Sequence, residues 1–332
     1  MNIDTLIVVV TYNSSDYIEN CLSSILSSSY KKWFLSLVDN NSSDDTIQKI
    51  SNLIKDYSAV KDPAACFTEG ENFNLTAMKK NAGFAPAINL AVKSFPYQAK
   101  NVRPNDVKYL VFINPDLFLE ENTLSELLST FESFNDCGVS GALIYDYDGK
   151  TIQHAGGRVY DNYITSHITE PLLQDGQIVT ADYATGALMA AKLKVFKMAG
   201  GFDTGYRPVY FEELDYCRKM QSLGLKTYIN LKAVARHFEG ASSKKFSGKF
   251  YIYYHKNRIR CAVINCTIPG FFKKFIPAEI KWLRSGATID QRWPLAKAYF
   301  LNFVFLFYNL IIKIRNSIII RRYKNLQDSN AA

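Results

Sequence analysis

The amino-acid sequence predicts an α/β fold with a mostly parallel central sheet and helices on both of its faces. Three apolar runs, at residues 5–10, 34–39 and 109–114, have the length and the β-branched or aromatic content of buried strands. Each run is followed by apolar residues at helical spacing, and strands that alternate with amphipathic helices usually pair in parallel. With 332 residues, 48% of them hydrophobic, the chain can bury the core that such a sheet needs.

The predicted helices follow the strands in chain order. Their apolar stripes are Ile18, Leu22, Ile25 and Leu26 in the first helix, Ile47, Ile50, Leu53 and Ile54 in the second, and Leu124, Leu127, Leu128 and Phe131 in the third. Ser43 and Asp44 start the second helix, and Asn122 is the predicted N-cap of the third, over residues 123–134. A fourth helix begins near residue 212 and precedes a last strand at residues 226–236.

Polar residues gather where three of the strands end. They are Thr11, Tyr12 and Asn13 after the first strand, Asp39, Asn40 and Asn41 at the end of the second, and Asn114 and Asp116 at the end of the third. A single polar turn would mean little, because loops from strand to helix are usually polar. Ligands of parallel sheets bind outside the carboxyl ends of the strands, so the three groups together predict one shared crevice.

The sequence contains neither of the two common glycine-rich nucleotide-binding motifs in the expected place. No G-x-G-x-x-G follows the first strand, and no G-x-x-x-x-G-K-[ST] occurs in the sequence. A phosphate-bearing ligand would then need a divalent cation on carboxylate oxygen, for which Asp116 is the first candidate. The alternative for Asp116 is a structural role in an Asx-type turn ahead of a helix.

Three acidic residues, Glu212, Glu213 and Asp215, crowd the start of the fourth helix. Acidic residues in a first turn are ordinary partners of the helix dipole, but three of them exceed what capping needs. On a helix, Glu212 and Asp215 share a face while Glu213 points about 100° away. One carboxylate can therefore face a reacting hydroxyl and remove its proton, while another binds or orients the substrate.

His237 follows the last predicted strand and precedes small, flexible residues. A lone histidine is more often a structural residue than a ligand. Beside a carboxylate, however, imidazole completes a site of the kind that Mn²⁺ occupies. His237 is therefore a second metal-ligand candidate.

Charge divides the chain near residue 245. Before residue 240 there are 22 Lys or Arg and 28 Asp or Glu, and from residue 240 onward there are 17 and 3. We therefore expect an acidic body over residues 1–245 and a helical, basic region over residues 246–332.

An apolar and aromatic run at residues 298–312 is followed by Lys313, Arg315, Arg321 and Arg322. The run is shorter than the roughly 20 residues that span a bilayer as a helix, so we expect a segment that lies in the interface of an anionic membrane. The alternatives are a helical hairpin packed on the body and a contact in a homodimer. The apolar stretch argues against binding to nucleic acid, which requires solvated Lys and Arg.

Short motifs occur in a fixed order over roughly residues 5–245. They are VVVTYNS, LVDNNSSDDT, KNAGFAPAIN, FINPD, DGKTIQHAGG, ATGALMAAK, GGFDTGY…YFEELD and HFEGASS. Each motif alone is weak, but the ordered set resembles the inverting family 2 glycosyltransferases of the GT-A fold, particularly their bacterial rhamnosyltransferase-like branch. The resemblance implies that residues 1–245 form a GT-A catalytic domain.

The resemblance also implies roles for single residues. The nucleotide- and donor-binding residues would be Thr11, Tyr12, Asn13, Asp39, Asn41, Asn81, Gly83, Phe84, Asn89, Asn114 and Asp116, with Asp39 reading the nucleobase. Asp116 and His237 would hold Mn²⁺ or Mg²⁺, with Asn114 in the first Asp position of the family's D-x-D motif. Glu213 stands where the family has its Asp base, so the base stays open among Glu212, Glu213 and Asp215. Ala and Pro in GFAPAIN replace small glycine-rich residues, which would narrow the donor pocket.

The implied reaction moves a sugar from a nucleoside-diphosphate sugar to a hydroxyl of a growing surface glycan or a polyprenyl-diphosphate-linked acceptor, as in O-antigen or capsule synthesis. It would be a metal-assisted single displacement with inversion, and dTDP-rhamnose is the first choice of donor. The alternatives are a UDP-hexose donor (Gal, Glc or GlcNAc) and, in another class, a non-catalytic protein that binds a sugar nucleotide, a membrane or nucleic acid. Asp4 precedes a run too short for a secretory signal, so we expect a cytoplasmic protein, peripheral on the inner face of a bacterial membrane.

Overall fold

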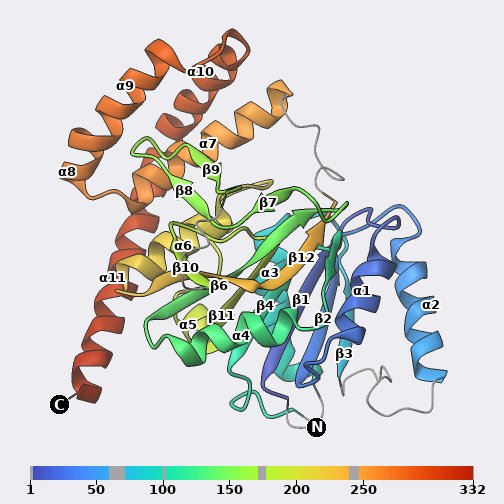
Figure 1. Cartoon of the computed structure of the whole chain (residues 1–332). Helices are drawn as coiled ribbons and strands as arrows, with labels where there is room; N and C mark the ends of the chain where they lie inside the picture. Colours follow the sequence, from blue (N-terminus) through green and yellow to red (C-terminus); the bar gives the residue numbers. More distant parts are fainter. Residues whose placement is uncertain (1–2, 60–71, 100–101, 171–176, 239–246, 332) are drawn as a thin grey trace.

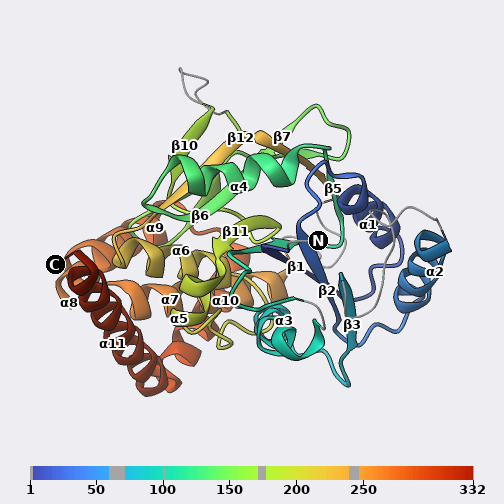
Figure 2. The same ribbon diagram turned by 90° about the horizontal axis from the view of Figure 1, so that it is seen from below.

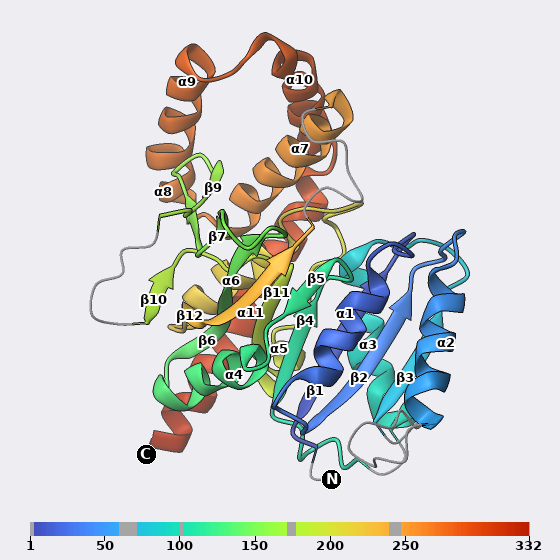
Figure 3. The ribbon, with the colours of Figure 1, turned by 45° about the vertical axis from the view of Figure 1, so that its right-hand side comes forward.

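The computed structural model describes residues 3–59, 72–99, 102–170, 177–238 and 247–331. Within these residues a ten-stranded sheet runs through the molecule, with helices packed against it on both sides (Figure 1). The predicted α/β class is confirmed. Helices α7 to α10 lie beyond the end of the sheet to which β2 and β12 point, whereas α11 runs back along the body towards the opposite end (Figure 3).

The elements of the body extend from residue 5 to residue 237. The first half contains β1 (Thr5–Thr11), α1 (Ile18–Ser27), β2 (Trp33–Asp39), α2 (Thr46–Ala59), β3 (Phe73–Ala77), α3 (Phe84–Gln98), β4 (Tyr109–Ile113), β5 (Leu117–Leu119) and α4 (Thr123–Ser133). The second half contains β6 (Cys137–Asp146), β7 (Ile152–His154), β8 (Gly157–Val159), β9 (Thr165–His167), β10 (Ile178–Ala181), β11 (Leu188–Lys192), α5 (Leu193–Met198), α6 (Glu212–Ser222) and β12 (Lys226–His237). After these come α7 (Gly248–Asn265), α8 (Ile268–Gly270), η1 (Phe271–Phe275), α9 (Ile276–Ser285), α10 (Ile289–Val304) and α11 (Leu306–Ala331).

The strands lie in the order β10-β12-β6-β11-β4-β1-β2-β3, with β5 paired to β12 and β7 paired to β6. The neighbouring strands β4, β1, β2 and β3 are parallel to one another, and β6 is parallel to β12. Between these two groups β11 runs antiparallel to both β4 and β6. The sheet is therefore mostly parallel, as predicted. The sequence did not reveal β11, because the alanines of its segment LMAAK give a weak strand signal.

Alternate residues of β1 serve the two faces of the sheet, as the two-residue period of a strand requires. Leu6, Val8 and Val10 pack in the core that contains residues of α3, α5 and α6, whereas Ile7 and Val9 pack in the core that contains residues of α1 and α4. All five side chains are buried. β1 thus lies between two layers of helices (Figure 2), and the chain leaves it at a fixed position and direction after Thr11.

The Asn-Pro-Asp turn after β4 is not followed at once by a helix. The short strand β5 intervenes and pairs antiparallel with the end of β12, with Leu117 opposite His237. Helix α4 then begins at Thr123, where it is predicted to begin. Asn122 occupies the N-cap position without a capping hydrogen bond, because its Oδ1 accepts a hydrogen bond from Ser29 Oγ at 2.8 Å instead.

Helix α7 ties the C-terminal helices to the body. Arg258 forms a two-point ion pair with Glu279 of α9, at 2.7 and 2.5 Å. Arg260 donates a hydrogen bond from Nη2 to Asp203 of the body at 2.7 Å. All four side chains are buried, and a buried ion pair that loses one partner is strongly destabilising. The predicted boundary between residues 245 and 246 lies outside the described residues, as do residues 239–243 of the HFEGASS motif.

The predicted apolar segment, residues 298–312, is helical on both sides of a bend at Phe305. Within the described residues no single helix is long and apolar enough to cross a bilayer, whereas α10 and the first part of α11 qualify together as a pair bent by 66°. Large apolar side chains near the bend stay exposed, among them Phe300, Phe303 and Phe307 at 65%, 76% and 77%. The body therefore leaves much of this apolar surface uncovered.

Candidate active site

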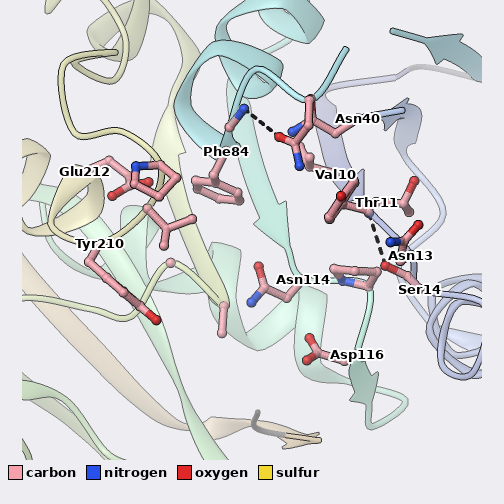
Figure 4. Close-up of a pocket in the computed structure, with 18 of the residues that line it drawn as sticks. Val10, Thr11, Asn13, Ser14, Asn40, Phe84, Asn114, Asp116, Tyr210 and Glu212 are labelled. Carbon is pink, nitrogen blue, oxygen red and sulfur yellow. Dashed lines mark hydrogen bonds between the residues drawn. The ribbon is translucent and has the colours of Figure 1, made fainter. Parts of the chain in front are cut away.

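A cavity of about 920 Å³ opens at the carboxyl ends of β1, β2 and β4. Its walls also include the start of α6, the end of β12 and the first turns of α7. Eleven predicted site residues line it, namely Thr11, Tyr12, Asn13, Asn81, Gly83, Phe84, Asn114, Asp116, Glu212, Glu213 and His237. In Figure 4, Glu212 and Tyr210 lie on one side of the cavity, Thr11, Asn13 and Ser14 on the other, and Asn114 between them. The remaining predicted residues, Asp39, Asn41, Asn89 and Asp215, lie outside the cavity lining.

Asp39 lies beneath the cavity and joins two of its loops. It is fully buried, and its Oδ1 accepts hydrogen bonds from Thr11 Oγ1 at 2.8 Å and Ser42 Oγ at 2.5 Å. Its Oδ2 accepts a further bond from the backbone N–H of Ser42 at 2.9 Å. Oδ2 can accept a second bond, and the contact of Asp39 with a nucleobase stays a prediction. Asn41 is exposed and has a positive φ of 69°.

Two asparagines hold the segment that carries Gly83. Asn40, which the sequence analysis did not select as a site residue, accepts a hydrogen bond from Ala82 N–H at 2.8 Å, and Asn81 accepts one from Gly83 N–H at 2.9 Å. Gly83 has a φ of +93°, and a Cβ there would meet the carbonyl oxygen of Pro208 at 2.9 Å. Glycine is therefore required at this position, where the segment that carries Gly83 touches the loop ahead of α6.

Asn89 holds the loop before α6 in place and does not reach the cavity. Its Oδ1 accepts a hydrogen bond from Phe202 N–H at 3.0 Å, and its Nδ2 donates one to the Phe202 carbonyl at 2.8 Å. Asn81, Gly83 and Phe84 therefore line the cavity, and their contact with a donor stays a prediction, whereas Asn89 positions the GGFD segment.

The pairing of β5 with β12 brings Asp116 and His237 together. Asp116 Oδ1 lies 3.2 Å from His237 Nε2, and both side chains are largely buried. On its other side, His237 Nδ1 lies 2.7 Å from Gln153 Oε1. Gln153 Nε2 donates to Asp146 Oδ1 at 3.1 Å, which orients the amide so that its oxygen faces the ring.

This chain of contacts sets the tautomer of His237. An amide oxygen can only accept, so Nδ1 carries a proton, and Nε2 is the ring nitrogen that faces the Asp116 carboxylate. Asp116 Oδ1 and His237 Nε2 thus face one another inside the cavity, and a ring nitrogen oriented by a polar partner is typical of metal-bound histidine. These residues fit a divalent cation. Among the described residues no group of three or more His, Cys, Asp or Glu could hold one, so other ligands must come from a substrate or from water.

The loop ahead of α6 is held in an unusual conformation. Tyr210 and Phe211 both have a φ of 81°, which costs of order 1–3 kcal/mol for each bulky residue. Asn257 of α7 supports them by donating Nδ2 hydrogen bonds to the carbonyls of Val209 and Tyr210, at 2.8 and 3.0 Å. The strained turn delivers Glu212 and Glu213 to the cavity wall.

Glu212 and Glu213 form a pair of carboxyl groups with little access to water. Glu212 is 3% exposed, and its Oε2 has no hydrogen-bond partner among the described residues. Burial, and then the Glu213 carboxylate, raise the pKa of Glu212 well above its ordinary value. Burial also raises the pKa of Glu213. Glu213 is the less buried of the two, so its ionised form is the better solvated and it is the better candidate for a base.

Asp215 turns away from this pair. Its Oδ1 accepts hydrogen bonds from Tyr206 OH at 3.0 Å and from Asn265 Nδ2 at 2.7 Å, and its Oδ2 lies 4.0 Å from the buried ammonium of Lys219. Helical periodicity placed Asp215 on the face of Glu212, but α7 covers that position. The structure therefore removes Asp215 from the cavity.

Several lining residues could not be selected from the sequence. Lys249, Phe250 and Tyr253 come from α7, and Gly186 lies opposite Glu213, whose side-chain carbons would be about 3.6 Å from a Cβ placed there. The sequence showed that residues 248–265 were basic and helical. The sequence did not indicate that side chains of this helix would line the cavity.

Known proteins resemble this chain in sequence. A family model described as "Glycosyl transferase family 2" matches residues 6–196. Rhamnosyltransferase WbbL of Escherichia coli is 24% identical over 190 residues, which cover 54% of this chain and 69% of WbbL. The N-acetylglucosaminyl-diphospho-decaprenol L-rhamnosyltransferase of Mycobacterium tuberculosis is 23% identical over 249 residues, which cover 70% of this chain and 75% of that enzyme.

Solved structures share the fold at low sequence identity. GalNAc-T7 with UDP, GalNAc and Mn²⁺ has a TM-score of 0.59 and 14% identity, and the match covers 79% of this chain but 48% of that one, about half its length. The mannosyltransferase PcManGT of Pyrobaculum calidifontis, in complex with GDP-Man and Mn²⁺, has a TM-score of 0.56 and 17% identity, over 99% of this chain and 84% of that one. At such identities the likeness shows the fold alone, and the predicted GT-A fold is confirmed.

Proposed function

Because this chain belongs to glycosyl transferase family 2, we propose that it transfers a sugar from a nucleoside-diphosphate sugar to a hydroxyl of a lipid-linked or growing glycan, with inversion. One observation carries the proposal. The adjacent carboxyls of Glu212 and Glu213 line the same cavity as the Asp116–His237 pair. A group that can accept a proton and a pair that can hold a cation are the two chemical needs of this reaction.

The cation-binding pair serves the leaving group in this proposal. Asp116 Oδ1 and His237 Nε2 would hold Mn²⁺ or Mg²⁺, and when bound the cation would supply Lewis-acid stabilisation of the departing diphosphate. Gln153 keeps the ring of His237 turned toward this position. Thr11, Tyr12 and Asn13, which line the cavity at the end of β1, would receive the nucleoside.

The carboxyl pair serves the acceptor. Glu213 would accept the proton of the attacking hydroxyl, because the reaction needs an ionised carboxylate and Glu213 is the less buried of the pair. Glu212, in its protonated form, would donate a hydrogen bond to the acceptor sugar. Attack on the anomeric carbon from the face opposite the diphosphate gives inversion in one step, without a covalent intermediate.

The donor we propose is dTDP-rhamnose, because the two curated relatives named above are rhamnosyltransferases. UDP-hexoses are the alternative. The test is a thermal-shift panel of nucleotide sugars with Mn²⁺, followed by an assay for released nucleoside diphosphate. A tight donor at 100 times its Kd should add about 2.7 kcal/mol to the stability. Release of the nucleoside diphosphate should need both an acceptor and the cation, and release that persists in EDTA would contradict the metal-assisted mechanism.

We also propose that the bent α10–α11 pair attaches the enzyme to the cytoplasmic face of an anionic membrane. The exposed side chains of Phe300, Phe303 and Phe307 support this role, and so do the basic residues of α11, each worth about 1 kcal/mol near anionic lipid. An interfacial helix of this composition buries its apolar side among lipid headgroups.

Flotation with lipid vesicles tests the attachment. The protein should float with vesicles that contain phosphatidylglycerol and much less with pure phosphatidylcholine. The double variant Phe303→Ser, Phe307→Ser should lose flotation by roughly tenfold or more, since two large apolar side chains are worth about 3 kcal/mol or more. Tyr160→Ser is the matched control, because Tyr160 is 54% exposed on the body. Equal flotation of the double variant and the control would show that another surface binds the membrane.

A further inference from the structure

A second cavity, of about 430 Å³, lies between α7 and the α10–α11 bend. Its lining includes Lys256 and Arg260 from α7, Leu301 from α10, and Phe305 and Tyr308 at the bend. Gly205, from the loop ahead of α6, closes one side. The family's motifs end before residue 246, so none of them accounts for this cavity.

Side chains on one face of α7 line both cavities. Tyr253 lines the first cavity, whereas Lys256 and Arg260 line the second, and positions three and four apart lie on the same helical face. With a rise of 1.5 Å per residue, Arg260 lies about 10 Å beyond Tyr253 along the axis. The loop ahead of α6 borders both cavities, because Gly205 lines the second and Pro208 the first.

The cationic side of the second cavity is rigid. Arg260 is 5% exposed, donates to Asp203 and Asn309, and lies between the rings of Tyr206 and Tyr308, with its guanidinium carbon 5.1 and 5.3 Å from their centroids. Its Nε has no hydrogen-bond partner among the described residues, although it is buried. A buried donor without a partner costs stability, and the two tyrosine rings and Asp203 hold the guanidinium in place at the cavity wall despite that cost.

Lys256 supplies the charge of this wall. Asp203 balances Arg260, whereas the half-buried ammonium of Lys256 donates to the carbonyl oxygen of Arg207. An ammonium has three donors, which leaves it able to bind an anion. Burial lowers the pKa of Lys256 and the neighbouring Arg260 lowers it further, against the smaller opposing effect of Glu212. A phosphate in the cavity would relieve that repulsion.

The rim of the cavity is apolar. Phe305 and Tyr308 are 52% and 45% exposed, and they continue into the exposed side chains of Phe303 and Phe307. A ligand that fits has a phosphate head for Lys256 and Arg260 and a hydrocarbon tail that leaves along this rim. That combination is the chemistry of a lipid diphosphate.

We propose that the second cavity binds the diphosphate of a lipid-linked acceptor, with its lipid chain along Phe305 and Tyr308 and its sugar reaching the first cavity along α7. This proposal rests on the proposed glycosyl transfer and adds how the acceptor is recognised. Lys256 is the principal phosphate ligand. The separation along α7 lets the diphosphate stay at Lys256 while the sugar hydroxyl reaches Glu213.

Isothermal titration calorimetry with farnesyl diphosphate tests the site directly. EDTA is present and the donor is absent, so that a cation at Asp116 cannot capture the diphosphate. The wild-type protein should bind farnesyl diphosphate, and Lys256→Gln should weaken the affinity by at least about tenfold, the effect of one charge-assisted hydrogen bond. Lys256→Arg should restore most of it. Inorganic pyrophosphate should bind more weakly than farnesyl diphosphate, because it lacks the tail.

Lys297→Gln is the matched control. Lys297 is exposed on α10, so its loss changes the net charge equally without touching the cavity, and it should leave the affinity unchanged. Equal weakening by Lys256→Gln and Lys297→Gln, or no binding to the wild-type protein, would overturn the proposal.

A transfer assay separates this proposal from the proposed function. Lys256→Gln should raise the KM for farnesyl-diphospho-N-acetylglucosamine and leave the KM for octyl N-acetylglucosaminide unchanged. If Lys256 acted only through the nearby Glu212, kcat would fall with both acceptors, which would also refute the site. Transfer with wild-type kinetics in Lys256→Gln would refute the site and leave the function intact. Lys256-dependent binding of farnesyl diphosphate without transfer from any donor would refute the function and leave the site intact.

Discussion

Glu213→Gln should lower kcat by about 10²–10⁴-fold, the usual contribution of a positioned general base. Glutamine keeps the shape and the hydrogen-bonding reach of the side chain but cannot accept the proton of the attacking hydroxyl. The KM for the donor should change little, because Glu213 faces Gly186 and is proposed to contact the acceptor and not the donor. Glu213→Asp should retain part of the activity, since it shortens the reach by one methylene and restores the residue that the family usually has.

The dependence on pH provides a second measurement of the same role. A base must be ionised, and burial raises the pKa of Glu213, so kcat/KM should fall as the pH decreases through that raised value. The acid limb should be absent from the residual activity of Glu213→Gln. Glu212→Gln is the neighbouring control, and its smaller loss should keep the limb. If Glu213→Gln stays within about tenfold of the wild type while Glu212→Gln loses more, the roles of the two carboxyls are reversed.

Asp116→Ala should abolish the cation-dependent part of both binding and catalysis. Without the carboxylate, His237 is the remaining protein ligand, and the charge on the leaving diphosphate is no longer stabilised. Lewis-acid stabilisation is worth several kcal/mol, so kcat should fall by about 10³-fold or more. The thermal shift that Mn²⁺ adds with a nucleoside diphosphate should disappear, which is a readout independent of turnover.

Asp148→Asn is the matched control for that experiment. Asp148 lies in the loop between β6 and β7, and its side chain is exposed and accepts a hydrogen bond from Lys150 N–H. It carries the same charge as Asp116 but does not line the cavity. A Mn²⁺-dependent shift that persists in Asp116→Ala would show that the cation is held elsewhere.

The part of the fold that depends on local patterning could be predicted from the sequence. β1, β2 and β4 are apolar runs of strand length, rich in β-branched and aromatic residues, and amphipathic helices are predicted after them. The meeting of Thr11, Asn114 and Asp116 at one edge of the sheet could therefore be predicted. β5 could not be predicted, because three residues carry no period of their own and β5 exists through its pairing with the end of β12. Yet this pairing is what sets Asp116 beside His237.

The part of the site that depends on distant contacts could not be predicted. Helical spacing grouped Asp215 with Glu212, and Asn265 of α7 alters the outcome by binding the Asp215 carboxylate. The same limit applies to Gln153, whose importance lies in a contact across 84 positions of the chain. Pattern and propensity describe an element's own residues, whereas these roles depend on which element packs against it.

Helix α7 connects the two proposed functions, since its first turns line the first cavity and the rest of it packs against the bent α10–α11 pair. If both proposals hold, a change in that helix pair would also shift a wall of the cavity. The mode of membrane attachment and the fit of the acceptor would then vary together.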